Sequence, residues 1–325
     1  MTAAVIVWSI LILLLVVFIV KRFLFAGTGG ADYNLQVDAT PFAKLRGRSI
    51  LLRGVLALIA TFIGLVVLWP EWLKNERLPV PDELLGVLWY GIFYLLIAHM
   101  LSRAQLSYSS LLGYRPGWST LGRYALWAVP LVIVSIGTIY LLYVPLSYLA
   151  PRFVEWLIIE SSVPLIWTSG PGYTVANVLS FLVVVVMAPL FEELVRALLL
   201  TRWSFKWGAP KAILVSSLLF GFMHTDIIGA FFFGYVASVL YIKTGSLLVP
   251  IIIHAANNLI AWAAWGVELA LSDSYPQSTL AEFQSWWWMG ALALVISAPW
   301  VIGFTRRHIP TTSWRVPYIA TELGS

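Results

Sequence analysis

Two adjacent carboxylates and a guanidinium stand inside an otherwise largely apolar run of the chain. Glu192, Glu193 and Arg196 lie between about Val175 and Leu200, where most other side chains are hydrophobic. Charged groups are costly at membrane depth and usually persist there for a functional reason. A glutamate within hydrogen-bond reach of a water molecule can also act as a general base. These three residues are therefore the first candidates for a reactive site.

Two later segments supply possible partners, His224 in one and His254 with Asn258 in the other. At about 1.5 Å of rise per helical residue, these three side chains and the two glutamates fall in the same half of a membrane or near its midplane. His254 and Asn258 are four residues apart and share a helix face. A histidine beside the glutamate can share its water or protonate a leaving amine. A His and Asn pair can donate hydrogen bonds to a developing oxyanion, so the parts for peptide hydrolysis are present.

Other interpretations of the same residues remain open. A glutamate and two histidines are plausible zinc ligands, although the chain lacks a His-Glu-x-x-His helix, the stronger zinc-protease pattern. We therefore prefer metal-free water activation and expect no cofactor. A Glu-Arg pair can also simply lock helices together, as in a scaffold that binds a partner helix. A proton-relaying transporter is the least favoured class, because the chain has no internal repeat.

The composition predicts an all-α, polytopic membrane protein. Of the 325 residues, 60% are hydrophobic and only 11% are charged, and many of the 17 Trp stand at the ends of apolar runs. The absence of Cys excludes disulfides and thiolate chemistry. At roughly 20 residues per span, we predict nine membrane segments, at Ala3 to Val20, Ile50 to Trp69, Leu84 to Leu101, Tyr124 to Tyr143, Val175 to Leu200, Ala212 to His224, Ile227 to Tyr241, Leu247 to Gly266 and Trp286 to Phe304.

Charges in the loops predict the orientation. Basic residues gather on one side of the predicted bundle and acidic residues on the other, for example Arg46, Arg202 and Arg306 against Glu71, Glu155 and Glu282. Because Lys and Arg favour cytoplasmic loops, we expect the N-terminus outside and the C-terminus in the cytoplasm. The same bias accounts for the net charge of +5 without a nucleic-acid partner.

Three motifs resemble those of the CPBP family of intramembrane proteases, also described as CAAX prenyl endopeptidases and bacteriocin-processing or Abi proteins. The resemblance covers about Val175 to Ile260. Its elements are Ala-Pro-x-x-Glu-Glu at Ala188 to Glu193, Phe-x-x-x-His at Phe220 to His224, and His-x-x-x-Asn at His254 to Asn258. Each motif alone is weak, but three in order at similar spacing are fairly specific.

The resemblance implies a role for each residue of the motifs. Glu192 would be the general base that activates water, with His224 as its partner. His254 and Asn258 would form the oxyanion hole. Glu193 would be a supporting residue held by an arginine, and Arg196 and Phe220 complete the supporting set.

One spacing differs from the family pattern. The family has Glu-Glu-x-x-x-Arg, whereas Arg196 follows Glu193 after only two residues. Arg196 is thus four residues after Glu192 and three after Glu193, and it can reach either carboxylate. A pair with Glu192 would weaken that residue as a base. The sequence leaves open which glutamate is the base, and a local helix bulge could restore the register.

We accordingly expect a glutamic intramembrane endopeptidase, multi-pass in the bacterial plasma membrane, that cleaves a peptide or membrane-protein substrate from the cytoplasmic half of the bilayer. An inactive CPBP-like scaffold or chaperone and a zinc-dependent protease are the alternatives. The expected organisation is an N-terminal helical part at 1–173, with a cytoplasmic loop at 26–49 and an outer interfacial segment at 151–172, a catalytic core at 174–266, and a last helix with a tail at 267–325.

Overall fold

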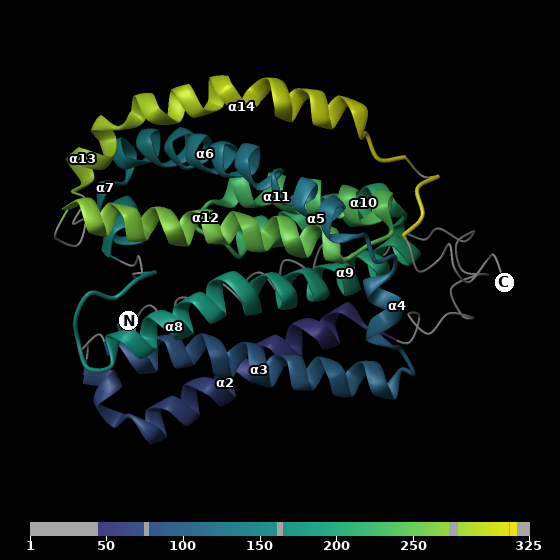
Figure 1. Cartoon of the computed structure of the whole chain (residues 1–325), viewed down its shortest axis with the longest axis horizontal. Coiled ribbons are helices and arrows are strands. Elements are labelled where there is room, and N and C mark those ends of the chain that lie inside the picture. Colours follow the sequence, from purple (N-terminus) through teal and green to yellow (C-terminus); the bar gives the residue numbers. More distant parts are fainter. Residues whose placement is uncertain (1–44, 75–77, 161–164, 273–278, 312, 317–325) are drawn as a thin grey trace.

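The computed structural model describes residues 45–74, 78–160, 165–272, 279–311 and 313–316. The predicted first membrane segment, Ala3 to Val20, lies outside these residues. Within them the backbone forms helices and one isolated bridge, between Gly113 and Ser246. In the labels of Figure 1 the elements are α2 (Gly47–Leu68), η2 (Pro70–Lys74), α3 (Pro79–Arg103), α4 (Tyr108–Leu112), α5 (Trp118–Ala125), α6 (Ala128–Leu149), α7 (Pro151–Val154), η3 (Glu155–Glu160), α8 (Tyr173–Phe181), η4 (Leu182–Met187), α9 (Ala188–Trp207), α10 (Ala209–Phe222), α11 (Ile227–Thr244), α12 (Leu248–Ser272), α13 (Leu280–Ser285) and α14 (Trp287–Arg307).

The helices are those of a polytopic membrane protein. In the described part, seven helical stretches are long and apolar enough to cross a membrane. Every predicted membrane segment that falls on described residues is helical, and the sixth is the shorter apolar helix α10. The prediction of an all-α membrane bundle is confirmed, while the total of nine segments stays a prediction.

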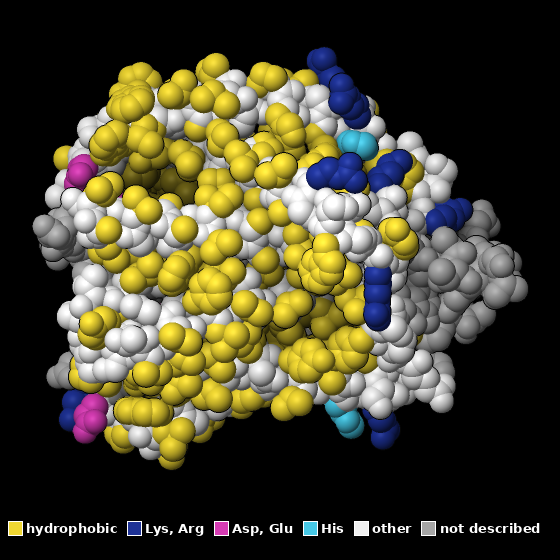
Figure 2. All heavy atoms as spheres, viewed as in Figure 1, with side chains coloured by type: hydrophobic (Ala, Val, Ile, Leu, Met, Phe, Trp, Pro, Cys, Tyr) yellow, Lys and Arg dark blue, Asp and Glu magenta, His cyan; other side chains and the backbone are white. Residues whose placement is uncertain are grey.

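Charge is distributed unevenly between the two ends of the bundle. Hydrophobic side chains cover the middle of the face in Figure 2, and most of its Lys and Arg side chains lie toward the right, where α3, α9 and α14 end in Figure 1. We call this end of the bundle the basic end. The last turns of these three helices carry Arg103, Lys206, Arg306 and Arg307. Proteins that cross a bilayer typically have an apolar girdle and an excess of Lys and Arg at one end.

The helices pack as successive layers around α9. The α2–α3 pair lies on one side of α9, and α10 and α12 contact it on the other (Figure 1). Helices α11 and α12 in turn pack on α6, and α6 packs on α14. Helix α9, which carries the first motif, thus contacts both α10 and α12, which carry residues of the other two motifs.

Helices α8, η4 and α9 form one continuous helical stretch, Tyr173–Trp207, of 35 residues. At 1.5 Å per residue it is about 50 Å long, well beyond the roughly 30 Å of a hydrocarbon core. Its middle part η4 is a π-helix that contains four consecutive valines and ends just before Pro189. Proline cannot donate a helical hydrogen bond, and a π-turn is one way in which a helix changes its register before such a residue.

Two glycines in left-handed or related conformations make the tight turns beside α9 and α12. Gly208, with φ of 80°, joins α9 to α10, and Gly245, with φ of 63°, ends α11 before α12. Both positive angles are strained for residues that carry a Cβ atom. With 14 residues, α10 spans only about 21 Å. The turn that carries His224 follows directly, and Phe222 and Met223 at the end of this helix are exposed.

Candidate active site

Glu193 is the centre of a fully buried polar cluster. Its side chain has no exposed surface, and Arg196 is only 3% exposed. Arg196 donates to Glu193 Oε2 from Nε at 2.9 Å and again from Nη2, and its Nη1 donates to Ser238 at 2.6 Å. His254 Nδ1 donates to the other carboxylate oxygen, Oε1, at 3.1 Å. Both oxygens of Glu193 are thus engaged by protein groups.

Glu192 has a different environment from that of its neighbour. Its side chain is 23% exposed, and its Oε2 lies 3.7 Å from His224 Nε2. The other oxygen, Oε1, accepts a hydrogen bond from the Tyr90 hydroxyl at 2.5 Å. Of the two glutamates, Glu192 is the one that combines a histidine partner with access from outside the protein.

Arg196 pairs with Glu193 across three residues of α9. The π-helix η4 ends at Met187, before both glutamates, so it leaves the short Glu193-to-Arg196 spacing unchanged. Three residues along an α-helix bring two side chains to the same face. The observed ion pair directs the guanidinium toward Glu193 and leaves Glu192 with Tyr90 and His224.

Phe220 connects the two histidines. Its backbone carbonyl lies 2.7 Å from His224 Nδ1. Because a carbonyl can only accept, this contact assigns the proton to Nδ1 and directs Nε2 toward Glu192. The Phe220 ring centroid is 4.4 Å from that of His224 and 5.8 Å from that of His254. The part-exposed pair of Glu192 and His224 and the buried Glu193 cluster therefore adjoin one aromatic ring.

Asn258 follows His254 by one turn of α12 and faces the π-helix. Its Nδ2 donates to the Val184 carbonyl at 2.8 Å, a backbone group in η4. A carboxamide nitrogen has two hydrogens. One of them binds Val184, which fixes the side chain to the α8–α9 stretch and leaves the second hydrogen as a further donor.

Comparison with known proteins adds family evidence to this geometry. Residues 174–260 match the family model described as Rce1-like, type II CAAX prenyl endopeptidase. Over these residues the chain is similar to the CAAX protease family. The matched residues include all three motifs, which confirms the resemblance that the sequence indicated. A search of curated proteins and a search of solved structures gave no match.

Tyr90 is a hydrogen-bond partner of Glu192 that the sequence analysis missed. It lies on α3, outside the matched residues, is 7% exposed and packs against Phe191 with ring centroids 5.5 Å apart. In the sequence it is one aromatic residue among many in an apolar segment, so its residue type did not indicate a functional role. Its role depends on how α3 packs against α9.

Asp226 is a second residue that the sequence analysis did not place near the site. It caps the N-terminus of α11 through the Gly229 N–H at 3.0 Å. Its carboxylate also accepts from Ser135 and, at 3.0 Å, from Thr138, both on α6. Asp226 therefore ties the turn after His224 to a neighbouring helix. The sequence feature that could have identified Asp226 is its position, two residues after the motif histidine His224.

The carboxylates and imidazoles are divided between the two clusters. Among the residues that the structure describes, no three His, Asp or Glu side chains gather closely enough to hold a metal ion. The zinc-dependent alternative stays untested, and metal analysis of the purified protein is the measurement that addresses it.

Proposed function

We propose that this chain is an intramembrane endopeptidase in which Glu192 and His224 activate a water molecule. The observation that carries the proposal is the contrast between the two glutamates. Glu192 is part-exposed beside His224, whereas Glu193 is fully buried and bound by Arg196 and His254. A general base must reach both its water and the substrate, and Glu192 meets this requirement better.

The proton positions support a bridging water. With its proton on Nδ1, a neutral His224 presents an acceptor, Nε2, to another acceptor, Glu192 Oε2, at 3.7 Å. Two acceptors at this distance suit a molecule that donates to both, and water is such a molecule. The water would lose a proton to Glu192 as its oxygen attacks the carbonyl carbon of the substrate. That proton would then pass to the leaving amine, directly or through His224.

The remaining polar groups suit the developing negative charge. His254 has its Nδ1 on Glu193, so its Nε2 is the ring atom left for the substrate. In the imidazolium form Nε2 would donate to the oxyanion, together with the second amide hydrogen of Asn258. Donors aimed at an oxyanion in a water-poor site stabilise the transition state strongly. We propose His254 and Asn258 for this role.

The test compares proteolysis by matched variants. Wild type, Glu192→Gln, His224→Gln and the exposed, distant control Glu71→Gln would be produced in cells, and new peptide termini in the membranes would be identified by mass spectrometry. We expect termini that depend on wild type and on the control but are absent with both site variants. A farnesylated CAAX peptide is the first purified probe, because the family description names prenylated CAAX substrates.

Identical termini in all four strains would contradict the protease proposal. If such strains also kept a measurable cellular function, the non-catalytic scaffold would replace it. The two outcomes are distinguishable because Glu192→Gln removes the base while preserving side-chain size and the hydrogen bond from Tyr90.

A further inference from the structure

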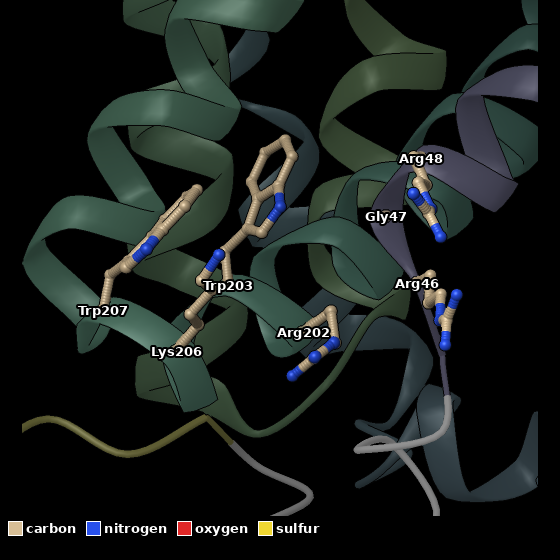
Figure 3. A pocket seen from close by; sticks show the side chains of 7 residues that line it. All are labelled: Arg46, Gly47, Arg48, Arg202, Trp203, Lys206 and Trp207. Carbon is tan, nitrogen blue, oxygen red and sulfur yellow. The ribbon is translucent and has the colours of Figure 1, made fainter. Parts of the chain in front are cut away.

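A cavity of about 300 Å³ lies at the basic end, between the start of α2 and the end of α9. Figure 3 shows Arg46 and Arg48 on one side of it and Arg202 and Lys206 on the other. The rest of its lining is Gly47, Trp203 and Trp207. Every charged side chain in the lining is a cation. Within the described ranges, no carboxylate forms an ion pair with Arg46, Arg48 or Arg202.

The indole of Trp203 forms part of the cavity wall. Trp203 is only 5% exposed and lines the cavity. A Cβ atom on Gly47 would lie 3.2 Å from its Nε1 atom, so a side chain at this position would crowd the indole. An indole N–H can only donate a hydrogen bond, and it therefore suits a ligand that accepts hydrogen bonds.

The backbone at the start of α2 adds to the positive potential. Arg46 is the N-cap residue, no side chain caps this terminus, and the first turn has no acidic residue. The first N–H groups of a helix lack helical partners and favour anions. Three guanidinium groups, an indole N–H and a helix N-terminus therefore surround one cavity.

A phosphate group fits this set of donors. Arginine binds phosphate oxygens through paired N–H groups. The stacked pair Trp203 and Trp207, with centroids 5.9 Å apart, lies at the end of a membrane helix, where tryptophan prefers the headgroup layer. Loop cations that only set orientation need not converge on a cavity. Basic pockets between membrane helices are known to bind anionic lipid headgroups.

We propose that this cavity binds the phosphate of an anionic phospholipid from the leaflet at the basic end. The lipid tails would lie along the apolar surface of the bundle, and the headgroup would occupy the cavity between α2 and α9. The proposal is independent of the protease proposal, because none of the cavity residues belongs to the Glu192 or Glu193 clusters.

The test measures lipid binding to the full-length protein in a neutral detergent by native mass spectrometry. The probes are short-chain phosphatidylglycerol, short-chain phosphatidylcholine and inorganic phosphate. The double variant Arg46→Gln/Arg202→Gln is compared with Arg306→Gln/Arg307→Gln, which removes the same charge at the same end. Gly47→Ala is a third variant that keeps every charge but narrows the cavity, and thermal unfolding checks that each variant is folded.

We expect wild type and the Arg306/Arg307 control to bind phosphatidylglycerol at least 10-fold more tightly than phosphatidylcholine. The Arg46/Arg202 variant should lose at least 10-fold in this affinity, and Gly47→Ala should lose several-fold. Equal losses in both double variants would show that only general surface charge attracts the lipid. No loss in the Arg46/Arg202 variant would show that the cavity does not bind it. Binding of inorganic phosphate without phosphatidylglycerol binding would also overturn the proposal and indicate a site for a soluble anion.

Discussion

At the scale of single residues, Glu192 and Glu193 are neighbours in the chain with opposite surroundings. Glu193 has no exposed surface and accepts hydrogen bonds from Arg196 and His254. Glu192 is part-exposed and contacts Tyr90 and His224. Substitution of each by glutamine should therefore produce different kinds of defect.

Glu193→Gln should destabilise the protein, because it leaves the buried Arg196 without its counter-charge. Breaking a buried ion pair by removing one partner costs about 3–5 kcal/mol. Glu192→Gln should leave stability nearly unchanged and lower the cleavage rate by roughly 10²–10⁴-fold, the usual contribution of a general base. Thermal unfolding in detergent and cleavage of the probe peptide measure the two effects. Equal stability losses would contradict this division of roles.

Tyr90→Phe tests whether the hydroxyl orients Glu192. The change removes one hydrogen bond to a charged group, which is worth about 1.5–3 kcal/mol, and keeps the ring contact with Phe191. We expect cleavage to fall about 10-fold or more while the fold is retained. Tyr235→Phe is a matched control, because that hydroxyl donates to the His308 carbonyl, away from Glu192. Unchanged cleavage in Tyr90→Phe would remove Tyr90 from the site.

At the scale of elements, the turn between α10 and α11 positions His224. Tyr143 donates to the Thr225 carbonyl at 2.6 Å, and Asp226 accepts from two hydroxyls of the same helix, α6. Backbone and side-chain polar groups within a membrane bundle need such internal partners. Helix α6 supplies such partners to the turn that follows α10.

Asp226→Ala should loosen this turn. It removes a helix N-cap, which costs about 0.5–2 kcal/mol, and it also removes the acceptor for Ser135 and Thr138. We expect a lower unfolding temperature together with reduced cleavage. Asp226→Asn keeps a side-chain acceptor for the Gly229 N–H and should recover most of both losses. If Asp226→Ala unfolds like wild type, the turn is held by other contacts.

At the scale of the whole molecule, the basic end predicts the orientation in the membrane. Ala281 and Ser313 are both exposed and flank α14. The chain has no native Cys, so Ala281→Cys and Ser313→Cys each introduce a single thiol. By the rule that cations favour the cytoplasm, a membrane-impermeant maleimide added to intact cells should label Ala281→Cys but not Ser313→Cys.

Cell lysis should make both thiols reactive, which controls for accessibility. The reverse labelling pattern would place the basic end outside and would contradict the predicted orientation. Labelling of both thiols in intact cells would contradict a spanning α14.

Sequence alone predicted the membrane class, the all-α fold and the residues of the three motifs. Apolar runs such as Ile50 to Trp69 predict helices. A backbone N–H or C=O group without a hydrogen-bond partner is energetically costly in lipid, and a helix provides partners within the segment itself. The cost of charge at membrane depth identified Glu192, Glu193 and Arg196 in the same way. Both arguments depend on properties of local sequence, so no knowledge of packing was needed.

Tertiary structure decided which glutamate each partner contacts. Spacings of three and four residues both allow an ion pair on a helix, so Arg196 could reach either carboxylate until the rotation of α9 against its neighbours was known. Tyr90 contacts Glu192 from α3, and Ser135 contacts Asp226 from α6, both across long separations in the chain. Such contacts arise from side-chain packing between helices, which the hydrophobic pattern of one helix does not specify.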